Sequence, residues 1–492
     1  MNAKKSNTEQ LEADIVIIGG GGSGVAAAAA AAEKGAKVIV LEKRGIGGIS
    51  AAAQGLFAVE SPAQKRLGIS LTKDEAFKLA MDFHHWRVNP RIVRAFVNKS
   101  GDTIGWLEQK GLYFEEVAQY PWSPYRFFHS LEPSLMGGAT IVKTLREYAE
   151  NLGVKIMTHC PAERLLTDAS HNIIGVAASV KDKEIQIKCK SVIITTGGFG
   201  ANRELLNKYI PDYEEHMVYT QIPNQGDGLI MATEIGAATE RKGSLLFHFP
   251  VYRDPKCISL TDFVLNGSPV WVNKKGERFA DESLRVFPPE CGNAVARQPD
   301  SCAVAIFDEK IKQTIIAESE RMNAERAKKH IKRAGSPPKT RSQEEILRSE
   351  AAKGTDVLIA DTLDDVARWL GIEAKVLKLT VEEYNALCRS GHDGLFNKNA
   401  KFLQAINTPP YYAIKSYVVY LTTLGVLKIN QNMEVLDHQD NPIRGLYAGG
   451  DTAGGIQGET YCMHMPGSAF GFAINSGRIA GESAAEYVSK IP

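Results

Sequence analysis

Gly19, Gly21 and Gly24 have the spacing G-x-G-x-x-G, which is typical of sites that bind the pyrophosphate of a dinucleotide. In such sites the first glycine permits a tight turn, the second lets the pyrophosphate approach the backbone, and the third lets a helix pack closely. Glu42 follows about 20 residues later, where a carboxylate can accept hydrogen bonds from ribose hydroxyls. These residues predict a dinucleotide site, and a purely structural strand–turn–helix unit is the alternative.

The flanking sequence predicts the elements that position these residues. Apolar residues 15–18 predict a buried strand before the glycines, and alanine-rich residues 25–32 predict a helix after them. Residues 37–41 predict a second strand that ends at Glu42. The free N–H groups at the start of the helix would then face the anion.

Further glycine-rich segments follow apolar runs or precede helices at 191–200, 224–228 and 445–451, and a last helix is predicted over 469–488. Segments so far apart that converge on one ligand favour FAD, because its extended shape requires many backbone contacts. A nicotinamide cofactor would require only the first segment. Because a second G-x-G-x-x-G is missing, we expect electrons to come from another protein or a free carrier.

Composition excludes several classes of protein. The 492 residues carry 58 Lys and Arg against 57 Asp and Glu, so nothing in the net charge of +1 favours nucleic acid or an acidic membrane surface. Seven scattered cysteines without C-x-x-C indicate reduced thiols rather than a metal or iron–sulfur site. The sequence has neither an apolar leader nor an apolar run of about 18 residues, so we expect a cytoplasmic protein without a transmembrane segment.

Taken together, these segments resemble the flavoprotein family of fumarate reductase, succinate dehydrogenase and 3-ketosteroid dehydrogenase. The matching residues are the opening fingerprint, 196–200, 226–228, 272–279, 409–411 and 445–451. The resemblance covers nearly the whole chain. It implies hydride transfer between flavin and a carbon–carbon bond next to a carbonyl or carboxylate.

The resemblance also implies an α/β fold, in which a Rossmann-like FAD-binding domain with a parallel sheet is interrupted by an inserted α+β capping domain. We assign 1–239 and 356–492 to the FAD-binding domain and 240–355 to the capping, or substrate, domain, because the sequence pattern changes near Glu240. Residues 155–159, 173–180 and 184–188 predict strands of one small sheet.

The resemblance and the glycine pattern together predict a cofactor site. The predicted FAD-binding residues are Gly19, Gly21, Ser23, Gly24, Glu42, Lys43, Gly48, Ser50, Gly55, Gly197, Asp227, Asp451, Gly467 and Ser468. Covalent members of the family attach FAD to a histidine in the loop after the ribose-binding acid. Residues 43–55 contain no histidine, so we expect non-covalent FAD.

The resemblance further implies the catalytic residues Arg285, Tyr461 and His464. Arg285 would donate the proton, and Tyr461 with the Gly467 amide would hold an enone carbonyl oxygen. For Tyr461 and His464, a packing role is the alternative. The histidines and most cations that bind fumarate in the family are replaced, as at 421–426. A dicarboxylate requires several fixed cations, so we do not expect fumarate as the substrate.

We therefore expect an FAD-dependent oxidoreductase that reduces or forms a C=C bond conjugated to a carbonyl or carboxylate. The partners would be a small unsaturated or carbonyl substrate and a redox partner protein. The aromatic segment 120–129 is either a surface loop or a wall of the substrate site. A flavoprotein oxidase and a non-catalytic flavin-binding subunit remain alternatives.

Overall fold

The computed structural model describes residues 9–121, 123–131, 137–181, 183–219, 222–328 and 341–491. The chain divides into two compact units, the first comprising 1–211, 221–246 and 422–492 and the second 212–220 and 247–421. Residues 356–421, which we assigned from the sequence to the FAD-binding domain, pack within the second unit. Which residues form the FAD-binding and capping domains stays a prediction.

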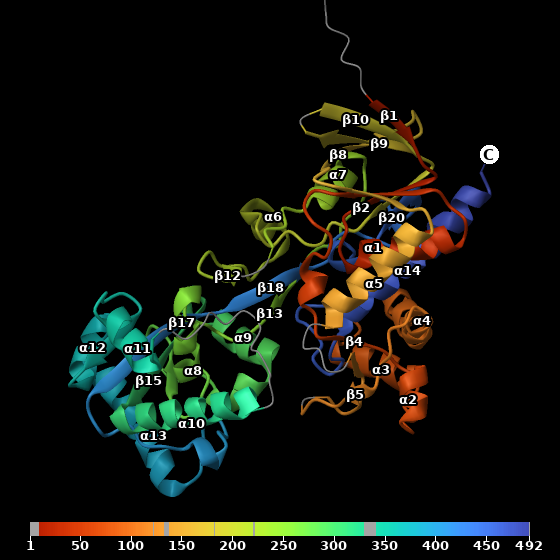
Figure 1. Ribbon diagram of the computed structural model, residues 1–492. Helices are drawn as coiled ribbons and strands as arrows, with labels where there is room; N and C mark the ends of the chain where they lie inside the picture. Colours follow the sequence, from red (N-terminus) through yellow and green to blue (C-terminus); the bar gives the residue numbers. More distant parts are fainter. Residues whose placement is uncertain are drawn as a thin grey trace, which may run out of the picture. The chain divides into compact units, whose positions relative to one another are not determined.

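The first unit contains a six-stranded sheet in the order β19–β20–β11–β2–β3–β7. Its strands are β2 (Ile15–Ile18), β3 (Val38–Glu42), β7 (Lys155–Thr158), β11 (Ser191–Ile194), β19 (Glu434–Leu436) and β20 (Pro442–Ala448). Strands β2 and β20 of this sheet are labelled in Figure 1. Every neighbouring pair is parallel except β19–β20. All of β2 is buried, as expected for a parallel strand covered on both faces. The predicted parallel sheet is confirmed.

Helices α1 (Gly22–Glu33) and α14 (Ser468–Ser489) pack against each other beside this sheet (Figure 1). A Cβ added to Gly477 would lie 2.1 Å from the Ser23 carbonyl oxygen, and one added to Gly481 would lie 2.4 Å from that of Ala27. Both distances are shorter than van der Waals contact, so larger residues would push the helices apart. Helix α5 (Gly137–Asn151) packs against α1 as well.

Two smaller sheets belong to the first unit. One has the order β1–β10–β9–β8, and the other β4–β6–β5. Their strands are β1 (Glu9–Glu12), β8 (Ala162–Thr167), β9 (Ile173–Val180), β10 (Lys183–Lys188), β4 (Gly55–Phe57), β5 (Glu116–Ala118) and β6 (Phe128–Ser130). The helices are α2 (Pro62–Arg66), α3 (Lys73–Phe83), α4 (Pro90–Glu108), α6 (Arg203–Tyr209) and α7 (Asp227–Glu234). The expectation that 155–159 joins the small sheet is wrong, because β7 pairs with β3 at the edge of the large sheet.

The second unit is built on a four-stranded antiparallel sheet in the order β14–β15–β17–β16. Its strands are β14 (Val270–Val272), β15 (Cys302–Asp308), β16 (Val357–Ala360) and β17 (Tyr411–Tyr417). The helices are α8 (Thr261–Val264), α9 (Pro288–Ala296), α10 (Glu309–Lys328), α11 (Gln343–Ala351), α12 (Leu363–Leu370) and α13 (Ala374–Ser390). Strands β13 (Ser244–Phe247) and β18 (Val419–Leu424) carry the chain between the two units, and β12 (Val218–Tyr219) pairs with β18.

Candidate functional site

The three fingerprint glycines form the turn between β2 and α1. The physical reason for glycine differs from one position to the next. Gly19 has φ +107°, which favours glycine. A Cβ added to Gly24 would lie 1.9 Å from the Gly19 carbonyl oxygen. At Gly21 the nearest atom to an added Cβ is the Gly47 carbonyl oxygen, 4.0 Å away. Packing therefore requires Gly19 and Gly24, whereas Gly21 borders open space where a ligand can approach the backbone.

Glu42 lies at the end of β3 and is tied to the glycine turn. Its Oε2 accepts the Gly20 N–H at 2.8 Å, and its Oε1 accepts the Arg44 N–H at 2.7 Å. Each carboxylate oxygen can accept a second hydrogen bond, so both can still accept from ribose hydroxyls. The two backbone bonds fix the carboxylate where the fingerprint requires it.

The loop after Glu42 lies against two helix starts. Lys43 forms an ion pair with Asp227 at the first residue of α7, so these two predicted ligands bind each other. A Cβ added to Gly22 would lie 2.7 Å from Ser50 Oγ, which places Ser50 beside the first turn of α1. At Gly55 an added Cβ would lie 2.3 Å from the His129 carbonyl oxygen, so strand pairing by itself requires that glycine.

The later glycine segments converge beside the fingerprint, as predicted. Thr452 Oγ1 donates to the Gly197 carbonyl at 2.9 Å, and the Gly228 N–H donates to Thr196 Oγ1 at 3.2 Å. The Gly449 backbone lies against α1, since a Cβ added there would be 2.7 Å from Ser23 Oγ. Residues more than 400 positions apart in the sequence therefore share one region of the first unit. The left-handed Gly48, with φ +56°, lies against Gly21 in the same region.

Two polar side chains in this region lack full hydrogen-bonding. Asp451 Oδ2 accepts from Thr422 Oγ1 at 2.7 Å, yet burial raises the pKa of Asp451 to about 6. Ser23 Oγ is buried, and it has no hydrogen-bond partner in the described part of the chain. A hydroxyl-rich and phosphate-containing ligand would satisfy both groups. The acceptors, the free hydroxyl and the open backbone at Gly21 fit FAD.

The start of α14 is held by Tyr461. Gly467, the N-cap residue, has φ +81°, and its carbonyl accepts the Phe57 N–H at 3.0 Å. The buried Tyr461 hydroxyl accepts the Ala469 N–H at 3.3 Å, which satisfies one of the free N–H groups at the helix start. Burial raises the pKa of Tyr461. The phenol therefore stays protonated and, with its oxygen used as an acceptor, can donate. Ser468 beside it is buried.

His464 lies beside the aromatic segment 120–129. Its ring meets the Phe83 ring edge to face, with centroids 5.3 Å apart, and its carbonyl accepts from Ser123 Oγ at 2.9 Å. Both contacts fix the loop that carries His464. Trp122 lies outside the described residues.

Arg285 lies in the second unit on the short helix η3 (Glu282–Val286). Its guanidinium lies over the Phe402 ring, 5.4 Å from the centroid. Its Nε is buried and has no hydrogen-bond partner among the described residues. Burial lowers the pKa of Arg285, although the charge of Glu318 opposes this effect. The structure thus presents a half-buried cation whose Nε donor is buried and unused by the described residues.

Sequence reasoning missed the side chains that support the predicted ones. Thr422 bonds Asp451, and Ser123 and Phe83 hold His464. Thr422 and Ser123 fall within segments that the sequence had singled out, but nothing in their spacing indicated these partners. Phe83 ends an ordinary amphipathic helix and gave no signal.

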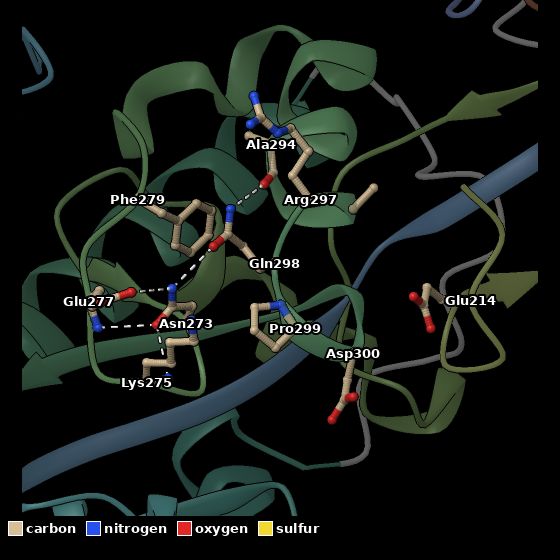
Figure 2. Close-up of a pocket in the computed structure, with 11 residues that line it drawn as sticks. Glu214, Asn273, Lys275, Glu277, Phe279, Ala294, Arg297, Gln298, Pro299 and Asp300 are labelled. Carbon is tan, nitrogen blue, oxygen red and sulfur yellow. Dashed lines mark hydrogen bonds between the residues drawn. The ribbon is translucent and has the colours of Figure 1, made fainter. Parts of the chain in front are cut away.

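A separate pocket of about 740 Å³ lies within the second unit, lined by residues of 273–279 and 294–300 with Glu214 (Figure 2). Asn273 Nδ2 donates to Glu277 and Gln298 across one wall, both at 3.2 Å (Figure 2). Its lining mixes acidic and basic residues and includes none of the predicted site residues. We do not assign it to the flavin site.

The fold and the converging glycine segments define a flavoprotein of the dinucleotide-binding α/β class. The chain belongs to the family described as FAD binding domain, which matches residues 14–463. FAD is therefore its cofactor, and it is an FAD-dependent oxidoreductase acting on CH–CH groups, as are its relatives.

Two relatives align with almost the whole chain. A vinyl phenol reductase from Lactiplantibacillus plantarum is 30% identical over 490 residues, covering 96% of each chain. A urocanate reductase from Eggerthella lenta is 32% identical over 501 residues, covering 96% of this chain and 75% of the relative. The predicted family resemblance is confirmed, and the relatives differ in the compounds that their names give.

Solved structures of two flavoproteins superpose on this chain. A flavocytochrome c3 fumarate reductase superposes with a TM-score of 0.72 at 26% identity, covering 97% of this chain and 79% of that one. The 3-ketosteroid Δ1-dehydrogenase of Sterolibacterium denitrificans has a TM-score of 0.76 at 21% identity, covering 96% and 99%, which shows a shared fold. Within the described residues, every helix is too short or too polar to cross a membrane.

The raised pKa of Asp451 predicts a pH dependence of apoprotein stability. The folded protein binds this proton more tightly than the unfolded chain, whose carboxyl has a pKa near 3.8. The free energy of unfolding should therefore fall as pH rises from about 4 to about 6, by on the order of 3 kcal/mol. Asp451→Asn should lose this component. Urea unfolding of both apoproteins across that range measures it, and superimposable pH profiles would contradict it.

Proposed function

We propose that the protein transfers hydrogen across a C=C bond conjugated to a carbonyl or carboxylate, in a substrate other than fumarate. The observation that carries this proposal is Arg285, a half-buried side chain whose buried Nε donor has no hydrogen-bond partner in the described part of the chain. The relatives named vinyl phenol reductase, urocanate reductase and NADH:acrylate oxidoreductase support alkene chemistry. A redox partner protein or a free carrier supplies the electrons.

In this proposal each residue has one task. Bound FAD, once reduced by that partner or carrier, would supply the hydride for one alkene carbon. Arg285 gives a proton to the other carbon and regains it from solvent, so the alkene gains two hydrogens and two electrons. Burial makes the guanidinium a stronger acid than in water, which favours this role. Tyr461 donates to the substrate carbonyl oxygen, since its own oxygen already accepts a helix N–H.

The aromatic surroundings of His464 support a ring-containing or weakly charged substrate. Phe83 and Tyr125 are half-buried, and Tyr125 packs edge to face on Phe127. A dicarboxylate would instead require several fixed cations, and the resemblance places His464 where fumarate reductases have an arginine. We therefore propose a ring-containing enone or an aryl or unsaturated monoacid as the substrate class.

Anaerobic stopped-flow spectroscopy tests the reaction. The photoreduced enzyme is mixed with 4-vinylphenol, urocanate, acrylate, a 3-oxosteroid enone or fumarate, and the return of oxidised flavin is followed. We expect at least one conjugated alkene to oxidise the flavin at least about tenfold faster than fumarate, the ratio that about 1.4 kcal/mol produces. If none of the alkenes reacts, the proposal fails. Rapid peroxide release in air without an alkene would favour an oxidase.

We further propose that FAD is bound without a covalent link. The loop at 43–55 carries no histidine, and the nearby His129 is buried with Ser61 Oγ at 2.7 Å from its Nε2. Precipitation with acid should release all flavin to the supernatant. Flavin that stays with the precipitated protein after washing would contradict this prediction.

A cytoplasmic location is part of the proposal. All seven cysteines are free thiols, and six of them are buried. Reduced thiols in that number are typical of a reducing compartment.

A further inference from the structure

The second unit contains a buried ion pair between Lys398 and Glu282. Lys398 Nζ lies 3.1 Å from Glu282 Oε2, and both side chains are fully shielded from solvent. These residues are far apart in the sequence, so the pair joins two segments of the chain. One segment carries Arg285, and the other carries Phe402, the ring under its guanidinium.

Glu282 holds the segment of Arg285. It is the first residue of η3, and Arg285 follows three positions later on the same short helix. Glu282 Oε1 also accepts the Trp271 N–H of β14 at 3.0 Å. The start of η3 is therefore fixed to the central sheet of the unit.

Lys398 holds the segment of Phe402. Its Nζ donates to the Tyr384 hydroxyl at 2.9 Å, and that hydroxyl donates to the Phe402 carbonyl at 3.4 Å. The ring also packs against Gly267, since a Cβ added there would lie 3.2 Å from it. Both the cation and the ring that supports it are thus fixed by one ion pair.

Two further residues make this buried cluster electrically neutral. Arg278 binds both oxygens of Glu282 at 2.9 Å, and it binds Asp393 at 2.7 Å. Two cations and two anions balance, so the cluster holds no spare negative charge for Arg285. Its effect on Arg285 is therefore geometric rather than neutralising.

We propose that Lys398 and Glu282 are positioning residues that hold the Arg285 guanidinium over Phe402, where its Nε–H has no acceptor among the described residues. The consequence for turnover rests on the proposed function, whereas the positioning does not. A displacement of about 1 Å in a catalytic group can cost about 100-fold in rate.

The double variant Lys398→Met, Glu282→Gln tests the positioning. It replaces both charged side chains of the pair, so neither residue is left as a buried charge without its partner. Lys375→Met on α13 is the control, since that side chain is exposed. The first readout is labelling of Arg285 by phenylglyoxal, mapped by mass spectrometry. We expect labelling to become about tenfold faster in the double variant, as local opening exposes the guanidinium, and unchanged in the control.

The second readout is the solvent deuterium isotope effect on reoxidation of reduced flavin by the best alkene. We expect reoxidation about 100-fold slower with a larger isotope effect and unchanged FAD content. General loosening would not raise the isotope effect. If the double variant does not fold, Phe402→Leu removes the supporting ring without altering charge and should increase labelling likewise. If the double variant is labelled at the wild-type rate, the positioning role is wrong. If it is labelled faster but its flavin is reoxidised at the wild-type rate, Arg285 is not the proton donor, and the proposed function fails with it.

Discussion

Replacing Arg285 by alanine should lower kcat for alkene reduction by about 10² to 10⁴-fold, the range for loss of a general acid. The guanidinium is the proposed proton source, and its Nε lacks a hydrogen-bond partner among the described residues. FAD content should not change, because the glycine segments lie in the first unit and Arg285 in the second. Steady-state kinetics and the flavin-to-protein ratio measure both effects.

Two further variants show whether the effect is specific. Arg285→Lys should recover little activity, because a lysine cannot reproduce the planar guanidinium that lies over Phe402. Arg297→Ala removes an exposed arginine from the same unit and should leave kcat within about twofold, as expected for a surface substitution. Full activity in Arg285→Ala would show that another group supplies the proton.

Gly21→Ala should weaken FAD binding and leave the apoprotein stable, whereas Gly24→Ala should destabilise the apoprotein. At Gly21 the added methyl meets only open space and the backbone has φ −77°, so the apoprotein should keep its stability. The methyl would nevertheless occupy the approach of the pyrophosphate. Loss of one or two charge-assisted hydrogen bonds should weaken FAD binding by about 100-fold, or about 3 kcal/mol.

At Gly24 the methyl would lie 1.9 Å from the Gly19 carbonyl oxygen, so the turn itself must move. The apoprotein should lose about 1–3 kcal/mol, the usual cost of overpacking. Thermal unfolding of the apoproteins and fluorescence titration with FAD separate the two cases. Wild-type FAD affinity in Gly21→Ala would place the pyrophosphate elsewhere.

The local part of the site could be predicted because its signals are local. A strand, three glycines, a helix and an acid lie within 14–42, and a backbone that must turn sharply admits few residue types. The same reasoning identified the glycine segments near Gly197 and Asp451. The sequence pattern did not distinguish the roles of Gly21 and Gly24, because both positions are simply glycine in it. The structure shows that Gly21 borders open space and that packing requires Gly24.

The sequence by itself determined the cofactor class, the fold class and the family of this protein. Only the tertiary structure decided the contacts between segments: Lys43 bound to Asp227, Tyr461 capping α14, and Lys398 paired with Glu282. Such pairs depend on side-chain packing between distant segments, and no periodicity or spacing records which two will meet. The G-x-G-x-x-G turn is read within one short stretch, whereas the surroundings of Arg285 exist only once the second unit has folded.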